Sequence, residues 1–147
     1  MTSAPLTIRL LREFAVIVGD ERVSAGAWRL RKGRSLVKIL ALAPEHQAHR
    51  DQLLELLWPD RDPEAAVNNL HQALHTARRA FEAAGGDGPE LLQLTDQIVT
   101  LCPNAPPTID VELFEAGVSR ARAERTPAAY EAAIGLYAGD LLPEDRY

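Results

Sequence analysis

The segment spanning residues 63–84 carries the side chains with the clearest chemistry. No carboxylate lies between Glu64 and Glu82, while amides, imidazoles and guanidiniums line one side of the segment. Asn and Gln can pair bidentately with adenine in the major groove of DNA, and Arg can pair with guanine. The absence of acids also avoids repulsion by phosphates. We therefore predict base readout by six side chains: Asn68, Asn69, Gln72, His75, Thr76 and Arg79.

Two other interpretations of this segment are open. It could be an ordinary solvated helix face, although such faces usually favour Glu and Lys. His71 and His75 are four residues apart, so both could reach one metal ion. However, "HQALH" lacks the Glu of the HExxH motif, and no Cys lies near it. We therefore expect no metal site and no other cofactor.

A second group of candidate residues is basic. Between Arg22 and Pro44 there are six basic residues and no acidic one. Residues 1–80 contain 12 Lys or Arg against 9 Asp or Glu, whereas residues 81–147 contain 4 against 12. The formal net charge of −5 therefore arises in residues 81–147. The basic residues of the first part could bind a polyanion such as DNA, and a solvated basic helix face is the alternative. The predicted phosphate contacts are Arg29, Arg31, Lys32, Arg34, Arg50 and Arg78.

The sequence lacks the motifs of common enzymes and of exported proteins. It has no G-x-S-x-G element, no Gly-rich phosphate loop and no paired-carboxylate pattern, so we do not expect an enzyme. The single cysteine, Cys102, excludes an internal disulfide framework. No apolar run approaches the roughly 20 residues that span a bilayer, and the start lacks the apolar core of a signal peptide. We therefore expect a cytoplasmic, nucleoid-associated protein with no membrane contact.

Short strands are the first of the elements that must position these residues. The segments 6–10 and 14–18 alternate or run apolar with β-branched residues, and a turn signal stands at 19–21. Residues 22–24 can form a short return strand. This pattern predicts a small antiparallel sheet.

Three helices are predicted after the sheet. The first spans residues 29–43 and ends before Pro44, and the second spans residues 50–58. The third spans residues 63–84, where Asp62 is a suitable N-cap. Its predicted core stripe consists of Val67, Leu70, Leu74, Ala77 and Phe81.

A hairpin is predicted at residues 91–103, with its turn at "TDQ". A short helix joined tightly to a third helix and followed by a hairpin is the layout of a helix-turn-helix with a C-terminal wing. The predicted fold class is therefore α+β. A three-helix core with no DNA function would give the same order of elements.

A second, all-helical part is predicted after the hairpin. Residues 104–109 form a Pro-rich linker, and two helical segments follow at 110–124 and 127–138. The predicted domains are a DNA-binding domain at 1–103 and a short helical domain at 110–147.

Several stretches together resemble a known family. "LTIRLL", "EFAV", "WRLRKGRSLVKILALAP", "HRDQLLELLWPD", "DPEAAVNNLHQALHTARRA" and "GDLLPED" are similar to stretches of transcriptional activators of the actinomycete antibiotic-regulatory-protein (SARP) type. The resemblance covers nearly the whole chain, and "LLELLWPD" and "NNLHQALHTARRA" are its strongest blocks.

The resemblance implies an OmpR-like winged helix-turn-helix followed by the start of a bacterial transcriptional activator domain of TPR-like helix pairs. It implies a recognition helix at 63–84, a wing at 91–103 and an activator domain from Asp110 onward. Binding to direct repeats in promoter DNA is implied, with RNA polymerase and its sigma factor as partners. A homodimer on the DNA is left open.

This sequence departs from the family pattern in three places. Position 12 is Arg where the family usually has Gly, and the wing has no Lys or Arg. The chain also ends at Tyr147, where the family's activator domain normally continues for roughly a further hundred residues. We expect either a fragment or a naturally truncated product, which binds DNA with or without activating transcription. A protein-interaction module that uses the acidic second half without binding DNA is the alternative function.

Overall fold

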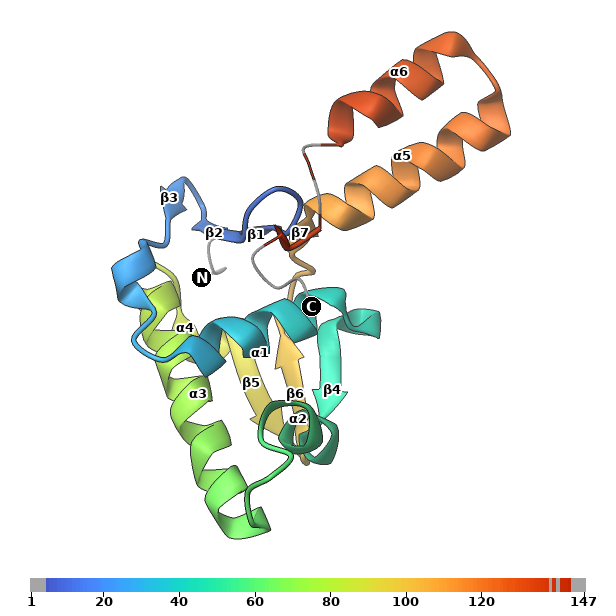
Figure 1. Cartoon of the computed structure of the whole chain (residues 1–147). Helices are drawn as coiled ribbons and strands as arrows, with labels where there is room; N and C mark the ends of the chain where they lie inside the picture. Colours follow the sequence, from blue (N-terminus) through green and yellow to red (C-terminus); the bar gives the residue numbers. More distant parts are fainter. Residues whose placement is uncertain (1–4, 138, 140, 144–147) are drawn as a thin grey trace. The chain divides into compact units, whose positions relative to one another are not determined.

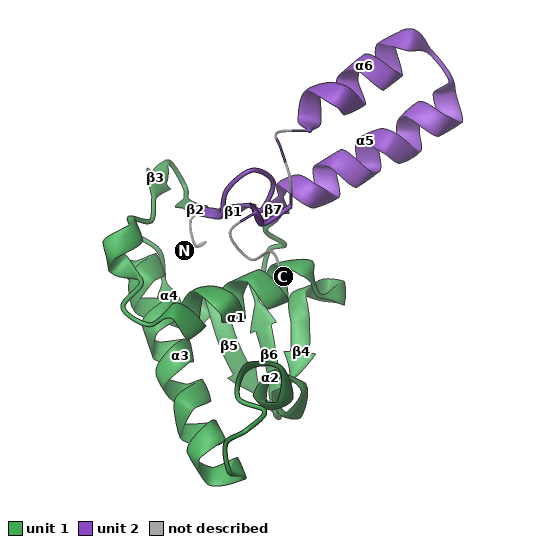
Figure 2. Cartoon of the chain, in the orientation of Figure 1, with its two compact units in different colours: residues 1–6, 17–107 green, residues 7–16, 108–147 purple. Residues whose placement is uncertain are grey.

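The computed structural model describes residues 5–137, 139 and 141–143, and it has the predicted α+β class (Figure 1). Contacts divide the chain into two compact units, which Figure 2 colours separately. Unit 1 comprises residues 1–6 and 17–107, and unit 2 comprises residues 7–16 and 108–147. Unit 1 therefore contains every predicted site residue.

Unit 1 begins with a small antiparallel pair of strands. β2 (Ala15–Val18) pairs through its second half with β3 (Glu21–Arg22). The predicted return strand at 22–24 is therefore placed one residue late. A single 3-10 turn, η1 (Ala25–Ala27), then leads toward the first long helix.

Three helices surround the core of unit 1. α1 (Arg31–Leu42), α2 (Arg50–Leu57) and α3 (Pro63–Ala83) lie within two residues of their predicted ends. Apolar side chains from all three are removed from water, which is the main favourable contribution to folding. The largest fully buried ones on these helices are Leu36, Leu40, Leu53, Leu70, Leu74 and Phe81.

The ends of α2 and α3 are fixed by side-chain caps. The carboxylate of Asp62 accepts a hydrogen bond from the amide of Ala65 at 3.0 Å, as expected for the N-cap of α3. At α2, Nδ1 of His49 accepts from the amide of Asp51 at 3.0 Å, and the side chain of Gln52 accepts from the amide of His49 at 3.4 Å. This is a capping box with an imidazole as the acceptor.

Besides η1, three short elements of unit 1 are absent from the sequence-based prediction. η2 (Pro44–His46) and β4 (Gln47–His49) lie between the first two predicted helices, and α4 (Gly88–Leu91) follows α3. β4 pairs antiparallel with β6 (Ile98–Leu101), which also pairs with β5 (Leu92–Thr95), so the sheet order is β4-β6-β5. Three residues are too few to show a periodicity, and the partner of β4 lies about fifty residues away in sequence.

The β5–β6 hairpin is the predicted wing, and it closes through a two-residue turn. Leu92 lies opposite Leu101 and Thr95 opposite Ile98. The loop residues Asp96 and Gln97 have φ angles of 53° and 68°. Positive φ at both central positions is the mark of a type I′ turn, whose twist matches that of the flanking strands.

Replacing Gln97 by Gly is expected to raise the free energy of unfolding by about 0.5–1 kcal/mol. A left-handed backbone conformation is strained in a residue that has a Cβ atom, and glycine has none. Urea titration followed by tryptophan fluorescence measures this change. Gln93→Gly, in the interior of β5, is the control and should lower stability, because glycine weakens a strand. A loss of stability in Gln97→Gly would contradict the turn assignment.

Cys102 follows the wing and is buried, with its amide donating to the carbonyl of Leu91 at 2.7 Å. Burial raises the pKa of the Cys102 thiol from 9.0 to about 12. At pH 8 the fraction of Cys102 present as thiolate should thus be about a thousandfold lower in the folded protein than in protein unfolded by urea. Because only the thiolate is nucleophilic, the folded protein should react more slowly by the same factor. The rate of reaction with a disulfide reagent tests this, and a native rate within tenfold of the unfolded rate contradicts it.

The pKa of Cys102 is higher in the folded protein than in the unfolded protein. Its burial therefore contributes stability that is fully present below pH 9 and is lost as the pH rises toward the folded value.

Unit 2 contains a parallel strand pair and a helical hairpin. Thr7 and Ile8 of β1 (Leu6–Arg9) lie opposite Thr108 and Ile109, which form β7. The carboxylate of Asp110, at the start of α5 (Asp110–Glu124), accepts hydrogen bonds from the amides of Leu10 at 2.8 Å and Leu11 at 3.0 Å. These bonds hold the start of α5 to the end of β1.

The helices α5 and α6 (Pro127–Leu136) pack closely through small residues. A Cβ atom at Gly117 would lie 3.0 Å from Cδ1 of Leu136, so this crossing has little room for a larger residue. Ala121, Ala129 and Ala133 form the buried cluster between the helices. The predicted end of α6 at residue 138 lies outside the described residues.

The compact units differ from the predicted domains. Residues 7–16 belong with residues 108–147, whereas the sequence placed them in a domain spanning 1–103. Two residues of the predicted linker at 104–109, Thr108 and Ile109, form β7. A parallel pairing across a hundred residues leaves no local signal in the sequence.

Arg12 lies in the turn that follows β1. Its φ angle of 72° falls in the left-handed region that favours glycine. The backbone here therefore adopts a conformation that glycine reaches without strain, although the residue is Arg.

Candidate nucleic-acid interface

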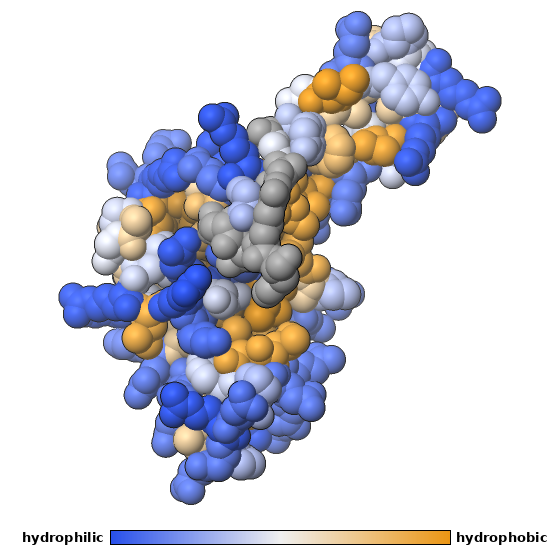
Figure 3. Space-filling model, viewed as in Figure 1, coloured by the Kyte–Doolittle hydropathy of each residue, from blue (hydrophilic) through white to orange (hydrophobic). Residues whose placement is uncertain are grey.

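Four of the six predicted base-reading residues lie on the exposed face of α3. Asn68, Gln72, His75 and Arg79 are exposed and follow one another at intervals of four, three and four residues. This spacing places them on one side of the helix, over about 16 Å of its length. We call these four residues the polar face of α3. Hydrophilic residues also cover the end of unit 1 at which α3 begins (Figure 3).

Thr76 does not lie on the polar face, so its predicted placement there is wrong. It is only 8% exposed, and a Cβ atom at Gly33 of α1 would lie 3.1 Å from its Cγ2. Thr76 therefore packs against α1. Asn69 is half-buried and lies at the edge of the polar face. The buried side of α3 is wider than the predicted stripe because it also includes Ala66, Ala73, Thr76 and Ala80.

The predicted phosphate contacts near α1 fall into two groups. Arg29 and Arg31 are exposed, and Arg34 is half-buried. The ammonium group of Lys32 donates to the carbonyl of Leu57, the last residue of α2, at 2.8 Å. A cation at this position interacts favourably with the negative end of the helix dipole. Lys32 thus stabilises the turn between α2 and α3, a role that its residue type alone did not indicate.

Arg78 is also tied into the fold, and Arg50 is partly buried. Nε of Arg78 donates to the carbonyl of Leu92 at 2.8 Å, which joins α3 to the first strand of the wing. Nε of Arg50 is buried, has no hydrogen-bond partner among the described residues, and lies 3.9 Å from a carboxylate oxygen of Asp51. Both side chains are half-buried. The guanidinium of Arg78 is therefore partly committed to the protein itself.

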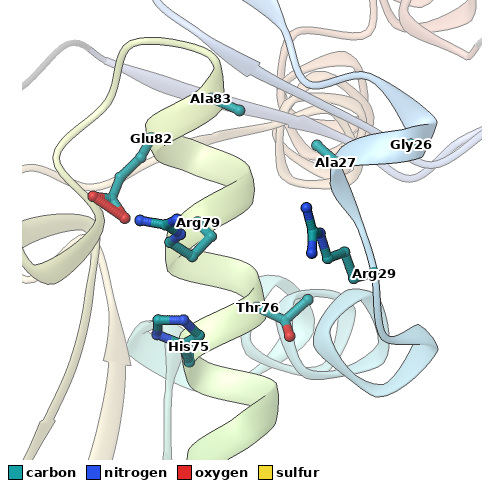
Figure 4. A pocket seen from close by; sticks show the side chains of 8 residues that line it. All are labelled: Gly26, Ala27, Arg29, His75, Thr76, Arg79, Glu82 and Ala83. Carbon is teal, nitrogen blue, oxygen red and sulfur yellow. The ribbon is translucent and has the colours of Figure 1, made fainter.

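A groove of about 560 Å³ lies between η1 and the second half of α3 (Figure 4). Arg29 lies on one side of this groove, and His75 and Arg79 project from α3 on the other. Thr76 also lines it, and Glu82 supplies the one carboxylate among the described residues that line it. The sequence did not predict this groove, because η1 is a single 3-10 turn without a periodic pattern.

In the described part of the chain, no cluster of three or more His, Cys, Asp or Glu side chains is suited to a metal ion, and His71 and His75 are both exposed. Within the same residues, no helix has the length and apolarity needed to cross a lipid bilayer.

Comparison with known proteins supports the fold. No protein-family model and no curated protein matches the sequence. Among solved structures, the chain is similar to Mycobacterium tuberculosis EmbR in complex with a low-affinity phosphopeptide, with a TM-score of 0.73 and 23% sequence identity. The alignment covers 96% of this chain and 38% of that chain, so the present chain corresponds to well under half of its neighbour. The helix-turn-helix with its C-terminal wing, followed by a helical hairpin, is thus an arrangement shared with a solved structure.

Proposed function

We propose that this chain binds duplex DNA in a sequence-specific way and regulates transcription, with α3 in the major groove. The observation that carries the proposal is the polar face of α3, on which Asn68, Gln72, His75 and Arg79 are exposed without an intervening acid. Amides and guanidiniums are the groups that pair bidentately with base edges. The exposed Arg29 and Arg31 would add contacts to phosphates, which position a protein on the duplex without reading its sequence.

The finer parts of the proposal rest on the resemblance to SARP-type activators. They are binding to direct repeats near promoters, recruitment of RNA polymerase through its sigma factor, and a role for residues 110–147 as the start of an activator domain. The fold shared with EmbR supports the winged helix-turn-helix arrangement, and an identity of 23% shows the fold alone.

A gel-shift titration against random duplex at low salt is the first test, followed by selection of bound sequences from a random DNA pool. We expect binding that weakens steeply with salt and an enriched sequence motif. Asn68→Ala should weaken binding to the selected sequence and leave binding to random duplex nearly unchanged, because it removes a base contact. The absence of any shift at low salt would overturn the proposal.

A protein-interaction module is the second candidate, and the surface of α6 favours it. Tyr130, Ile134 and Tyr137 are 47%, 70% and 51% exposed, and they lie at helical spacing on or just after α6. Exposed apolar patches of this kind often mark sites of protein contact. The gel shift against random duplex at low salt separates this candidate from the first, because a protein-interaction module of this kind does not bind DNA. If the gel shift is intact, a reporter-gene assay then separates a protein that binds DNA and activates from one that only binds.

A further inference from the structure

The two halves of α3 have different surroundings. In Figure 1 the first half forms the lower end of unit 1, and η1 and α4 lie beside the second half. All α3 residues that line the groove belong to the second half: His75, Thr76, Arg79, Glu82 and Ala83. Asn68 and Gln72 lie before the groove begins. The groove therefore borders the polar face of α3 at the end that carries His75 and Arg79, and not at the end that carries Asn68 and Gln72.

This difference limits how far α3 can enter DNA. The major groove is about 12 Å wide and admits one α-helix, which with its side chains is about 10–12 Å across. The first half of α3, whose residues do not line the groove beside η1, is narrow enough to enter the major groove. The second half is not, because η1 adds a second wall beside it. Where the protein becomes too wide for the major groove, the sugar-phosphate backbone of one strand must pass over it.

We propose that the groove between η1 and α3 receives this backbone, and that Arg29 and Arg79 contact its phosphates from opposite walls. This rests on the proposed DNA binding and changes one part of it. Arg79 becomes a phosphate contact, and base readout is confined to the half of α3 that carries Asn68 and Gln72.

The charges and shape of the groove agree with this assignment. Arg29 and Arg79 are exposed, and neither guanidinium has a hydrogen-bond or ion-pair partner among the described residues. Glu82 lies one turn beyond Arg79, so its carboxylate repels a phosphate and favours a position nearer His75. On the opposite wall, a Cβ atom at Gly26 would meet nothing within 4 Å. The wall at Gly26 therefore leaves room for a backbone to approach.

The test compares Arg79→Ala, Arg79→Lys and Arg29→Ala on two duplexes of equal length, the selected sequence and a random one. A phosphate contact predicts that Arg79→Ala weakens binding to both duplexes by the same factor, about 5–10-fold near 0.1 M salt, and lowers the slope of log affinity against log salt by about 0.9. Arg29→Ala should act in the same way. Arg79→Lys should retain most of the affinity and the full slope, because Lys keeps the charge that a phosphate needs.

Base readout by Arg79 predicts the opposite pattern. Arg79→Ala and Arg79→Lys would then both lose affinity for the selected duplex alone, and repeating the selection with Arg79→Lys would relax one base position of the motif. That result would overturn the proposal while leaving DNA binding intact. Failure of the unaltered protein to bind either duplex would instead overturn the proposed function. Gly26→Glu supplies an independent measurement, since it places a carboxylate in the groove and should weaken binding to both duplexes.

Discussion

Gln72→Glu is expected to lower affinity for the selected DNA sequence by about 10–100-fold, because it replaces an amide that can pair with a base by a carboxylate that faces phosphates. Gln72 is exposed near the middle of the polar face, so the substitution leaves the core untouched. Binding isotherms at several salt concentrations measure the effect. Unlike Asn68→Ala, this variant should also bind random duplex less well, since repulsion by phosphates does not depend on sequence.

The matched control for this experiment is Asn104→Asp. It makes the same exchange of an amide for a carboxylate at an exposed position in the loop after β6, and it changes the net charge by the same amount. Affinity should remain within twofold of the unaltered protein, because the new charge lies outside the proposed interface. Equal losses in Gln72→Glu and Asn104→Asp would mean that total charge, and not the polar face of α3, governs binding.

Phe81→Ala is expected to reduce the free energy of unfolding by about 3–5 kcal/mol, which is the usual cost of removing a large buried aromatic side chain. Phe81 is fully buried in α3, and its ring meets that of Trp28 edge to face, with ring centroids 6.1 Å apart. Urea titration at low temperature, with tryptophan emission as the probe, measures the loss. The emission of the folded variant should also shift as Trp28 loses this neighbour.

Leu56→Ala is the control for the loss of a large apolar side chain. Leu56 is 64% exposed on α2, and its removal should change stability by less than about 0.5 kcal/mol. If the free energy of unfolding of Phe81→Ala lies within about 1 kcal/mol of that of the unaltered protein, Phe81 is not a central part of the core. The contact between Phe81 and Trp28 also holds the segment after η1 against α3, so Phe81→Ala tests the support of the groove wall as well as the core.

The long elements of this fold were predictable because their signals are local. Asp62 and the proline after it define the start of α3, and the predicted and observed starts agree. The helix at 110–124 was predicted with both of its observed ends. β4 and β7 were not predictable, because each is two or three residues long and is defined by a partner far away in the sequence.

The candidate site was predictable in residue type but only in part in geometry. Periodicity correctly grouped Asn68, Gln72, His75 and Arg79, because a face opposite an apolar stripe follows from 3.6 residues per turn. It misplaced Thr76, because the width of the buried side depends on how closely α1 approaches at Gly33. The bonds that commit Lys32 and Arg78 to the fold are equally invisible in a linear sequence, since each joins a side chain to a carbonyl of another element.

The turn of the wing affects the timescale of motion at the proposed interface. The carbonyl of Gln97 accepts a hydrogen bond of 2.7 Å from the amide of Arg50, the first residue of α2. The tip of the hairpin therefore cannot swing outward without exposing an amide at the beginning of the helix-turn-helix. Hydrogen–deuterium exchange at Arg50 would then proceed through openings that include the hairpin, and the lifetime of that single amide would report how often the wing leaves the helices.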